Sequence, residues 1–278
     1  MKIIQATGQT CNQFWIYSHY FAESLASGDK IMILAPDIAL KDYPNLTKQR
    51  FLKYPFYNKL GVSVLSYKRY VRILNLVFAN KITIRIFTYL FKLIPKVSFV
   101  EGHMEAFTSS KKSKYKKELK KIFKPTDVVV DFVDKFIKEK RGLFQVIVGV
   151  HIRRGDYQTW HNGKYFYTDE EYNKIIGQLK ILFPNKRVGF LICSNEKIYL
   201  ENFNNKDVFF FKNSSAAIDL YGLGLCDYVV GPPSSYSAWA SYYGNIPLYF
   251  LKDINNRISL DQFFIDEFPW PPLNIDKK

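Results

Sequence analysis

The sequence has few cysteines, no long hydrophobic run and, over much of its first half, no acidic residue. Its 278 residues include three cysteines, Cys11, Cys193 and Cys226, which lie far apart. Their odd number and wide spacing predict neither a disulfide framework nor a metal-binding cluster, and buried free thiols are the expected alternative. We therefore expect a reducing, cytoplasmic setting.

The absence of long apolar runs bears on whether the chain is predicted to cross a membrane or to be secreted. No stretch of about 18 consecutive apolar residues occurs, so we expect no transmembrane helix. The first residues, Met1–Gln5, enter a strand-like segment directly and do not have the profile of a signal peptide. Hydrophobic residues make up 47% of the chain. This fraction and the chain length suit two domains of ordinary size, each with its own core.

Acidic residues are absent between positions 43 and 100, where eleven Lys and Arg occur. The basic segment, residues 43–124, holds 19 basic and 3 acidic residues, whereas the rest of the chain holds 21 basic and 22 acidic residues. The net charge of +15 therefore belongs to this segment. It is consistent with an ordinary solvated face, an anionic membrane surface, an acidic or lipid-linked glycan acceptor, or nucleic acid. Residues 67–91 mix Arg and Lys with Ile, Leu and Phe, so a peripheral association with anionic membrane is preferred to nucleic acid, which we do not expect as a partner.

The chain divides near residue 140 into two predicted domains. Residues 1–140 form an N-terminal, acceptor-binding domain with the basic segment as an insertion, and residues 141–278 form a second domain. The expected elements of the first domain are strands at Lys2–Gln5 and Ile31–Leu34, helices at Asn12–Ala26 and Asp127–Lys140, irregular helix over Phe51–Lys96, and a polar helix or linker at Lys111–Lys124.

The second domain alternates strands and helices. The expected strands are Val146–Val150, Val188–Cys193, Val208–Phe211, Tyr228–Gly231 and Pro247–Leu251, and the expected helices are Thr168–Leu182, Glu196–Phe203, Ser214–Leu225 and Ser234–Tyr243. Alternation of this kind predicts a doubly wound parallel sheet. The predicted fold class is therefore α/β, with two Rossmann-like domains that face a cleft.

The most informative motif, His-Ile-Arg-Arg-Gly-Asp-Tyr, occupies positions 151–157 directly after the apolar strand Val146–Val150. Ligands of open α/β sheets bind beyond the carboxyl ends of the strands. Side chains alternate along extended backbone, so His151 and Arg153 should point to one side and Arg154 to the other. Arginine binds phosphate with two parallel hydrogen bonds and keeps its charge. We therefore predict an anion site at Arg153, buttressed by an ion pair between Arg154 and Asp156.

Other strand ends of the second domain also carry polar residues. Ser234 and Ser235 follow the strand Tyr228–Gly231 and begin a helix, where hydroxyls, free backbone N–H groups and the helix dipole attract anions. A plain serine N-cap is the alternative interpretation. Asp219 lies in the preceding helix and is either an exposed helix residue or a carboxylate that pairs with the N–H edge of a base.

These motifs resemble those of the α-1,2-fucosyltransferases and, more distantly, of the α-1,6- and protein O-fucosyltransferases. The motif at 151–157 is similar to the first signature of that family. Asp-Leu-Tyr at 219–221, continuing to Ser-Ser-Tyr-Ser-Ala-Trp at 234–239, is similar to the second. The loop Gly8–Phe14 resembles the Gly-Gly-x-Gly-Asn-Gln loop of the family, but two of its glycines are replaced. The resemblance is specific over about 146–245 and absent over 43–124.

The resemblance implies a GT-B type glycosyltransferase with GDP-fucose as donor, bound by the second domain. It implies Arg153 as the pyrophosphate ligand, His151 and Asp219 as contacts of the guanine or ribose, and Ser234 and Ser235 as donors to phosphate. Asn12, in the N-terminal loop, is a further donor-site candidate. Arg154 and Asp156 are expected to form a structural pair that holds the loop.

Glycosyl transfer from a nucleoside diphosphate requires stabilisation of the negative charge that builds on the leaving phosphate, by a metal or by fixed cationic donors. The chain contains no Asp-x-Asp triplet, so we expect no metal and no other cofactor, with Arg153 and a helix N-terminus as the metal-free solution. The acceptor hydroxyl is expected to attack with inversion. The candidate base is His161, with Asp156 and Glu170 as alternatives, and an oxocarbenium-like path would need no strong base.

The sequence thus predicts a fucosyltransferase that makes an α-1,2 linkage to galactose of a bacterial surface polysaccharide, acting on an oligosaccharide or lipid-linked acceptor. Transfer of another sugar from GDP, or a different fucose linkage, is the first alternative. A basic nucleotide-binding or nucleic-acid-binding module without transferase activity is the second.

Overall fold

The structure is a computed structural model that describes residues 1–6, 8–34, 41–53, 80–102, 110–204 and 206–265, together with 69, 72, 73, 76 and 77. The chain forms two compact units, 1–126 and 127–278. The division falls ahead of the boundary predicted near residue 140, because helix α6 (Asp127–Arg141) counts with the second unit. Much of the basic segment, including residues 54–68 and 103–109, lies outside the described residues.

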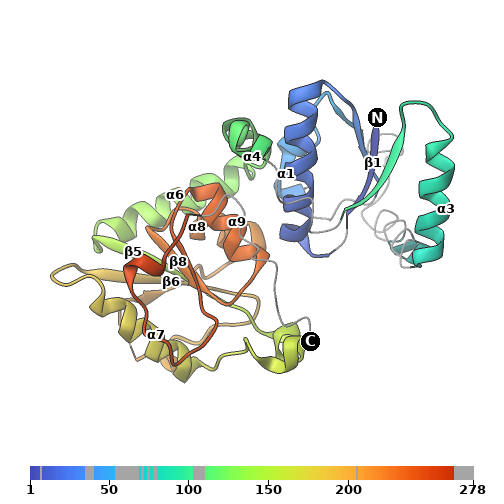
Figure 1. Ribbon diagram of the computed structural model, residues 1–278. Coiled ribbons are helices and arrows are strands. Elements are labelled where there is room, and N and C mark those ends of the chain that lie inside the picture. Colours follow the sequence, from blue (N-terminus) through green and yellow to red (C-terminus); the bar gives the residue numbers. More distant parts are fainter. Residues whose placement is uncertain are drawn as a thin grey trace. The chain divides into compact units, whose positions relative to one another are not determined.

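The first unit contains a parallel sheet in the order β3-β2-β1-β4. Its described strands and helices are β1 (Lys2–Ala6), α1 (Thr10–Ser27), β2 (Ile31–Ile33), β3 (Leu52–Lys53), α3 (Lys81–Lys92), β4 (Ser98–Gly102), α4 (Ser110–Lys114) and α5 (Lys116–Ile122). Helices α1 and α3 lie on opposite sides of this sheet (Figure 1). Helix α1 ends at Gly28, whose φ of 77° is the left-handed conformation that glycine adopts at low cost.

The expected opening of this unit is present, whereas two strands of the sheet were not predicted. Strand β3 has only two residues and lies in the stretch that we expected to be irregular helix, whereas β4 lies between residues 97 and 110, where we predicted no element. The region 111–124, left open between helix and linker, forms the short helices α4 and α5. Lys112 of α4 is buried with its ammonium 5.0 Å from the centre of the Trp15 ring. Cation–π contact of this kind lowers the cost of burying a charge.

The second unit contains a parallel sheet in the order β7-β6-β5-β8-β9. Its strands and remaining helices are β5 (Val146–Ile152), α7 (Asp169–Ile181), β6 (Val188–Ser194), β7 (Val208–Phe209), α8 (Ala216–Leu223), β8 (Tyr228–Gly231), α9 (Ser235–Gly244) and β9 (Leu248–Phe250). Helix α7 covers one face of the sheet, and α6, α8 and α9 cover the other (Figure 1). The predicted doubly wound arrangement is therefore present.

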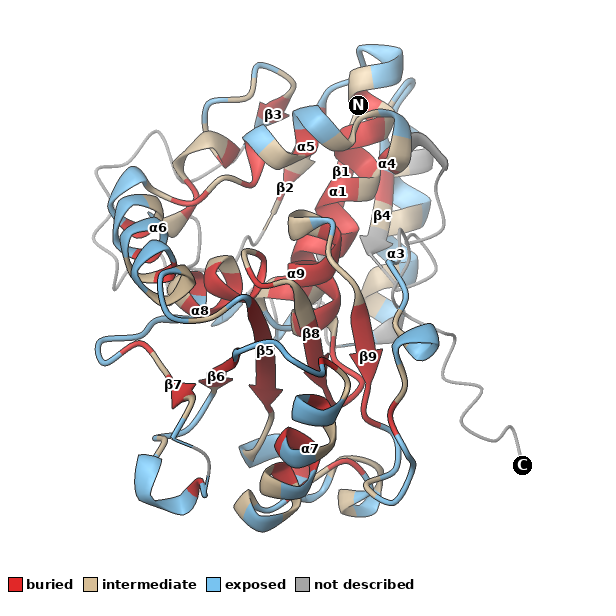
Figure 2. Ribbon diagram, turned by 90° about the vertical axis from the view of Figure 1, so that its left-hand side faces the viewer, coloured by how far each residue is buried: buried red, intermediate tan, exposed pale blue. Residues whose placement is uncertain are grey.

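Local sequence explains these elements. All seven residues of β5 are buried, as expected for a central parallel strand that is covered on both faces. Helix α7 begins with a complete capping box, in which the Thr168 and Glu171 side chains each bond the other's backbone N–H. Figure 2 shows β5 buried and β8 buried except at its start, whereas α6 and α7 carry both buried and exposed residues, the pattern of helices that cover a core.

The helix predicted at Glu196–Phe203 is wrong. Only one turn of 3-10 helix forms there, at Leu200–Asn202. The Ser194 hydroxyl accepts a hydrogen bond from the Glu196 N–H at 3.1 Å, which favours a turn over a helix start. An eight-residue segment has little helical stability of its own, and the apolar residues of this segment would not lie on one helix face.

Glycine residues permit the close approach of α8 and α9. A Cβ atom on Gly244 would lie 2.2 Å from the backbone oxygen of Gly224, and backbone cannot move aside as a flexible side chain can.

None of the helices in the described residues has the length and apolar character needed to cross a bilayer.

We predict that Gly244→Ala lowers the free energy of unfolding by about 2 kcal/mol or more, because the added methyl forces α8 and α9 apart. Gly177→Ala is the matched control, since nothing lies within 4 Å of a Cβ at this exposed position in α7. The control should raise the stability by about 0.5 kcal/mol. Urea denaturation followed by circular dichroism measures both changes, and equal midpoints for the two variants would contradict the packing argument.

Candidate functional site

The strand order of the second sheet defines where a ligand would bind. The chain runs from β5 outward through β6 to β7, then returns to β8 on the other side of β5. The reversal places a topological switch point between the carboxyl ends of β5 and β8, the position at which open α/β sheets bind ligands. Val150 pairs with Val230, so the residues after them, 151–157 and 231–235, leave the sheet at this same edge.

His151 is buried at the end of β5, with 3% of its surface exposed. Its ring lies 5.0 Å from that of Tyr236 in α9. Burial, together with the charge of Arg153, lowers the pKa of His151 to about 3, so the ring is neutral near pH 7. Its Nδ1 atom is buried without a hydrogen-bond partner among the described residues. Such an atom carries a desolvation penalty that a ligand hydrogen bond would relieve.

Arg153 lies beside the loop between β8 and α9. Its guanidinium pairs with the Asp156 carboxylate at 2.9 Å and stands 5.6 Å from the centre of the Tyr157 ring. The Tyr157 hydroxyl donates a hydrogen bond to the backbone oxygen of Pro233 at 2.6 Å. Burial raises the pKa of Tyr157 to about 12, so the hydroxyl keeps its proton. Tyr157 therefore connects Arg153 with the loop that leads to Ser234.

The predicted ion pair between Arg154 and Asp156 is wrong. Arg154 turns to the α7 side of the sheet, where its guanidinium pairs with Asp169 at the start of that helix. The Asn202 side chain donates to the other Asp169 oxygen at 2.6 Å. Side-chain alternation explains the result, because Arg153 and Arg154 project to opposite faces and only Arg153 can reach Asp156. Arg154 thus has the structural role that we expected, but its partner is Asp169 and not Asp156.

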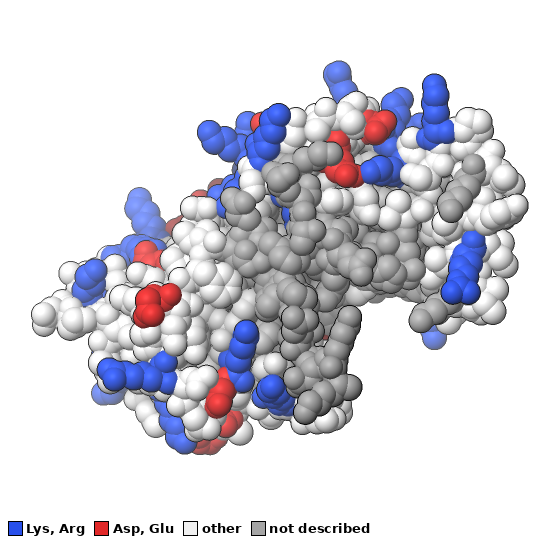
Figure 3. Space-filling model, in the orientation of Figure 1, with Lys and Arg blue, Asp and Glu red and all other residues white. Residues whose placement is uncertain are grey.

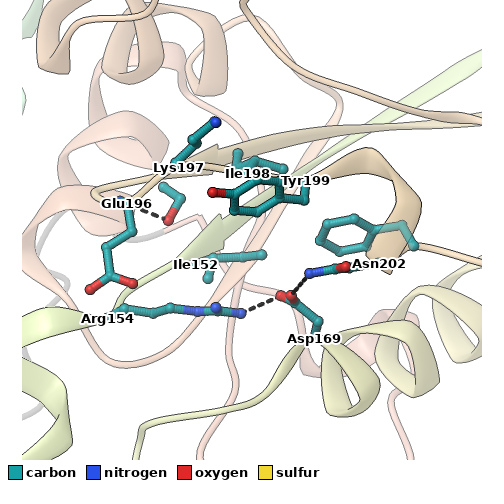
Figure 4. A pocket seen from close by; sticks show the side chains of 10 residues that line it. Ile152, Arg154, Asp169, Glu196, Lys197, Ile198, Tyr199 and Asn202 are labelled. Carbon is teal, nitrogen blue, oxygen red and sulfur yellow. Dashed lines mark hydrogen bonds and ion pairs between the residues drawn. The ribbon is translucent and has the colours of Figure 1, made fainter.

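The ion pair of Arg154 with Asp169 borders a cavity of about 360 Å³. Figure 4 shows the Arg154–Asp169–Asn202 chain of hydrogen bonds along one side, with Ile152, Glu196, Lys197 and Tyr199 around the rest. The cavity lies on the α7 side of the sheet edge, and none of the residues predicted to hold an anion lines it. Its arginine and aspartate are paired with each other.

Ser234 is the N-cap of α9. Its hydroxyl accepts a hydrogen bond from the Tyr236 N–H at 3.2 Å, and the residue is buried. The ordinary N-cap interpretation therefore holds for this hydroxyl. Ser235, the first residue of the helix, is partly exposed. The positive end of the α9 dipole, with its first-turn backbone N–H groups, faces the same edge as Arg153.

Asp219 is buried in the first turn of α8, so the exposed alternative is wrong. Its carboxylate accepts a hydrogen bond from the Ser214 hydroxyl, and its backbone oxygen accepts one from the Cys193 thiol at 3.7 Å. Burial raises the pKa of Asp219 to about 6, against the opposing effect of the Ser214 hydrogen bond. The Tyr236 hydroxyl donates to the Ala216 oxygen at 2.6 Å, which joins the start of α8 to that of α9.

His161 lies in a loop of unusual backbone conformation. His161, Asn162 and Gly163 have φ values of 50°, 56° and 74°, three successive left-handed residues, of which only glycine adopts this conformation freely. The His161 ring lies 4.3 Å from that of Trp160, which lies 4.6 Å from that of Tyr157. An aromatic chain thus connects His161 with the residue that contacts Arg153.

Asn12 lies on α1 in the first unit, beside Gly8. A Cβ at Gly8 would lie 2.5 Å from the Asn12 side-chain nitrogen, and Gly8 has a φ of 84°. The neighbouring residue Thr7 lies outside the described residues. Among the residues that the structure describes, no group of three His, Cys, Asp or Glu side chains could hold a metal ion.

The structure therefore gathers His151, Arg153, Asp156, Ser234 and Ser235 at one sheet edge, with Asp219 connected to them through α8. Sequence reasoning missed the roles of Tyr157 and Tyr236, although both stand inside the quoted motifs. A tyrosine among charged residues at a strand end was the available signal, because its ring can pack while its hydroxyl bonds.

Comparison with protein families identifies the chain. A model described as glycosyl transferase family 11 matches residues 71–250. The chain belongs to glycosyl transferase family 11, the α-1,2-fucosyltransferase family. The match contains both motifs of the second unit and reaches back into the basic segment. Comparison with curated proteins gave no match.

Solved structures confirm the predicted fold class of this family 11 protein. The fucosyltransferase NodZ from Bradyrhizobium superposes with a TM-score of 0.59 at 16% identity, over 92% of this chain and 96% of that one. A variant of Arabidopsis thaliana FUT1 in complex with GDP gives 0.55 at 12%, over 94% and 73%. POFUT1 in complex with GDP gives 0.53 at 11%, over 90% and 98%. The fold is thus α/β of the GT-B type.

We predict that Arg154→Ala lowers the free energy of unfolding by about 2 kcal/mol, because it removes a charged hydrogen-bond donor from the partly buried Asp169. Arg187→Ala removes an exposed arginine from the same unit and should change stability by less than about 0.5 kcal/mol. Chemical denaturation of both variants checks the difference. If Arg154→Ala were as stable as the control, the ion pair of Arg154 with Asp169 would not stabilise the fold.

Proposed function

We propose that this family 11 protein transfers fucose from GDP-fucose to a glycan hydroxyl, forming an α-1,2 linkage to galactose of a bacterial surface polysaccharide. The observation that carries the proposal is Arg153, held at the switch point beside the start of α9, in a chain of this family. NodZ and POFUT1 have been crystallised with GDP, and NodZ also soaked with GDP-fucose, which supports the same donor here.

The donor contacts that we propose follow the chemistry of each group. Arg153 and the backbone N–H groups of Ser234 and Ser235 bind the pyrophosphate. His151 offers its unpaired Nδ1 atom to the nucleoside, and Asp219 accepts the N–H edge of guanine. Asn12 of the first unit is a further donor-site candidate that we propose from the family resemblance.

Charge stabilisation is the main catalytic task. The acceptor oxygen forms a bond to the anomeric carbon of fucose from the face opposite the phosphate, so the configuration inverts. The bond between that carbon and the phosphate oxygen breaks, and GDP leaves with the electron pair. Arg153 and the α9 dipole stabilise the growing negative charge. We propose that this arrangement works without a metal ion or another cofactor.

The acceptor proton needs a destination. We propose His161 as the base, because an imidazole nitrogen can accept a proton and the left-handed backbone of His161 is a costly conformation of the kind kept at functional sites. Asp156 is the weaker candidate, since its carboxylate is paired with Arg153. We assign Asp156 to holding the Arg153 guanidinium in place.

The acceptor is proposed to be an oligosaccharide or a lipid-linked glycan in the cytoplasm, with no role for nucleic acid. Linkage analysis of the product formed with galactose-terminated acceptors tests the α-1,2 assignment. Transfer of a different sugar from GDP, or a product with another linkage, is the outcome that would replace it.

We predict that Arg153→Ala reduces transfer from GDP-fucose by about 100-fold or more, the usual effect of removing one donor to a developing anion. Arg153→Ala should also abolish the increase in melting temperature with GDP, which we expect to exceed that with UDP, CDP or ADP. Arg257→Ala, at an exposed position of the same unit, serves as the control. EDTA should leave the wild-type rate unchanged. Full transfer activity in Arg153→Ala would refute the proposal.

We predict that GDP affinity falls about tenfold from pH 7 to pH 5, because protonated Asp219, with a pKa of about 6, no longer accepts the guanine N–H groups. Titration calorimetry across this range should show a weaker pH dependence in Asp219→Asn, while the titration of the nucleotide phosphate is common to both proteins. Parallel pH profiles of GDP affinity in the wild type and Asp219→Asn would rule out the proposed contact between Asp219 and guanine.

The same carboxyl affects stability without ligand. Its pKa is higher in the folded protein than in the unfolded chain, so the folded state binds the proton more tightly. Asp219 therefore makes stability fall as the pH rises from about 4 to about 6, and its full cost remains above pH 6. Unfolding curves between pH 4 and pH 6 should lack this fall in Asp219→Asn. The same curves show that the variant is folded when its GDP affinity is measured.

A further inference from the structure

Helix α3 has two apolar faces, and among the described residues one of them packs against the sheet while the other is exposed. Ile84, Phe87 and Phe91 face the sheet, where they pack around Ile3 and Phe99. The Phe91 and Phe99 rings are stacked at 5.9 Å. This inner face therefore attaches the helix to the sheet.

The opposite face of α3 is exposed and equally apolar. We call it the outer face; it consists of Ile82 (65% exposed), Ile86 (52%), Tyr89 (65%), Leu90 (50%) and Leu93 (65%). These positions recur every three to four residues, so they form one continuous stripe. At 100° per residue, the stripe lies about half a turn away from the inner face.

Exposed apolar residues continue on both sides of the helix in the sequence. Ile94 follows the stripe directly, and Ile73, Leu76 and Val77 precede α3, with exposures of 48%, 59%, 68% and 38%. Single exposed apolar side chains are common, but a continuous stripe marks an interaction surface.

The surroundings of the outer face are basic. Arg85 on α3 is exposed, as are Arg69, Arg72 and Lys96, which precede or follow the helix in the sequence, and residues 43–100 contain no Asp or Glu. In Figure 3 the surface over α3 shows basic and uncharged side chains without acidic ones. A partner must therefore accept both a row of aliphatic side chains and an excess of positive charge.

We propose that the outer face of α3 docks on the surface of a bilayer that contains anionic lipids, with the helix lying in the plane of the interface. Ile and Leu side chains would enter the acyl boundary, and Arg and Lys would contact the lipid phosphates. A second copy of this chain fits less well, because a symmetric contact would bring two acid-free basic faces together. Nucleic acid would use the charges but leave the aliphatic stripe unpaired. The proposal does not depend on the transfer reaction.

The test is co-sedimentation of the full chain with vesicles, either of phosphatidylcholine alone or with about 30% phosphatidylglycerol. We expect binding to the anionic vesicles, weak binding to the neutral ones, and a decline as salt rises from about 0.05 M to about 0.5 M. The double variant Ile86→Ser with Leu93→Ser should bind anionic vesicles at least tenfold more weakly.

The matched control is Val128→Ser with Ile181→Ser, which removes two apolar side chains that are 80% and 78% exposed in the second unit. Its vesicle binding should equal that of the wild type. All four substitutions are at exposed positions, and unchanged melting curves verify folding. Equal vesicle binding by both double variants would overturn the proposal. So would a dimer, detected by analytical ultracentrifugation without lipid, that only the α3 variant loses.

Discussion

The parallel pairing of β5 with β8 is the constraint on which the second unit depends. These two strands are distant in sequence, and the register Val150 with Val230 brings two polar strand ends to one edge. The motif at 151–157 alone would be a cluster of charges, and Ser234 alone would be a helix cap. Their adjacency supports the anion site that we propose, because the guanidinium and the helix dipole then face the same sheet edge. The buried hydrogen bond from Tyr157 to Pro233 fixes their spacing.

The period of extended backbone separates the two arginines of this motif. Arg153 shares its side of the sheet with His151 and the α9 start, whereas Arg154 shares the other side with α7. The first pairs with Asp156 on the side of α9, and the second pairs with Asp169 at the start of α7. One strand end therefore supplies both a binding group and its support. The unpaired Nδ1 atom of His151 lies on the binding side, where a nucleoside would satisfy it.

Charge is distributed between the units according to different tasks. The second unit lies in the electrically balanced part of the chain, so the charge of Arg153 does not belong to a general basic surface. The excess positive charge lies with the first unit, around a helix whose outer face is apolar. A local, partly buried cation gives specificity, whereas a diffuse exposed set gives attraction to an extended anionic surface. The two sets of basic residues need not share a ligand.

The sequence by itself determined the alternation of strands and helices in the second unit, the division of the arginines between two faces, and the resemblance to fucosyltransferases. Each of these depends on local periodicity or on residues that stand close together in the chain. Only the tertiary structure decided that Arg154 pairs with Asp169 and Arg153 with Asp156, that Asp219 is buried, that 196–203 is not a helix, and that β4 joins the first sheet. These outcomes depend on contacts between distant residues, which periodicity does not encode. The outer face of α3 is the clearest case, because the sequence shows a basic, apolar segment and only packing reveals which of its two apolar faces stays exposed.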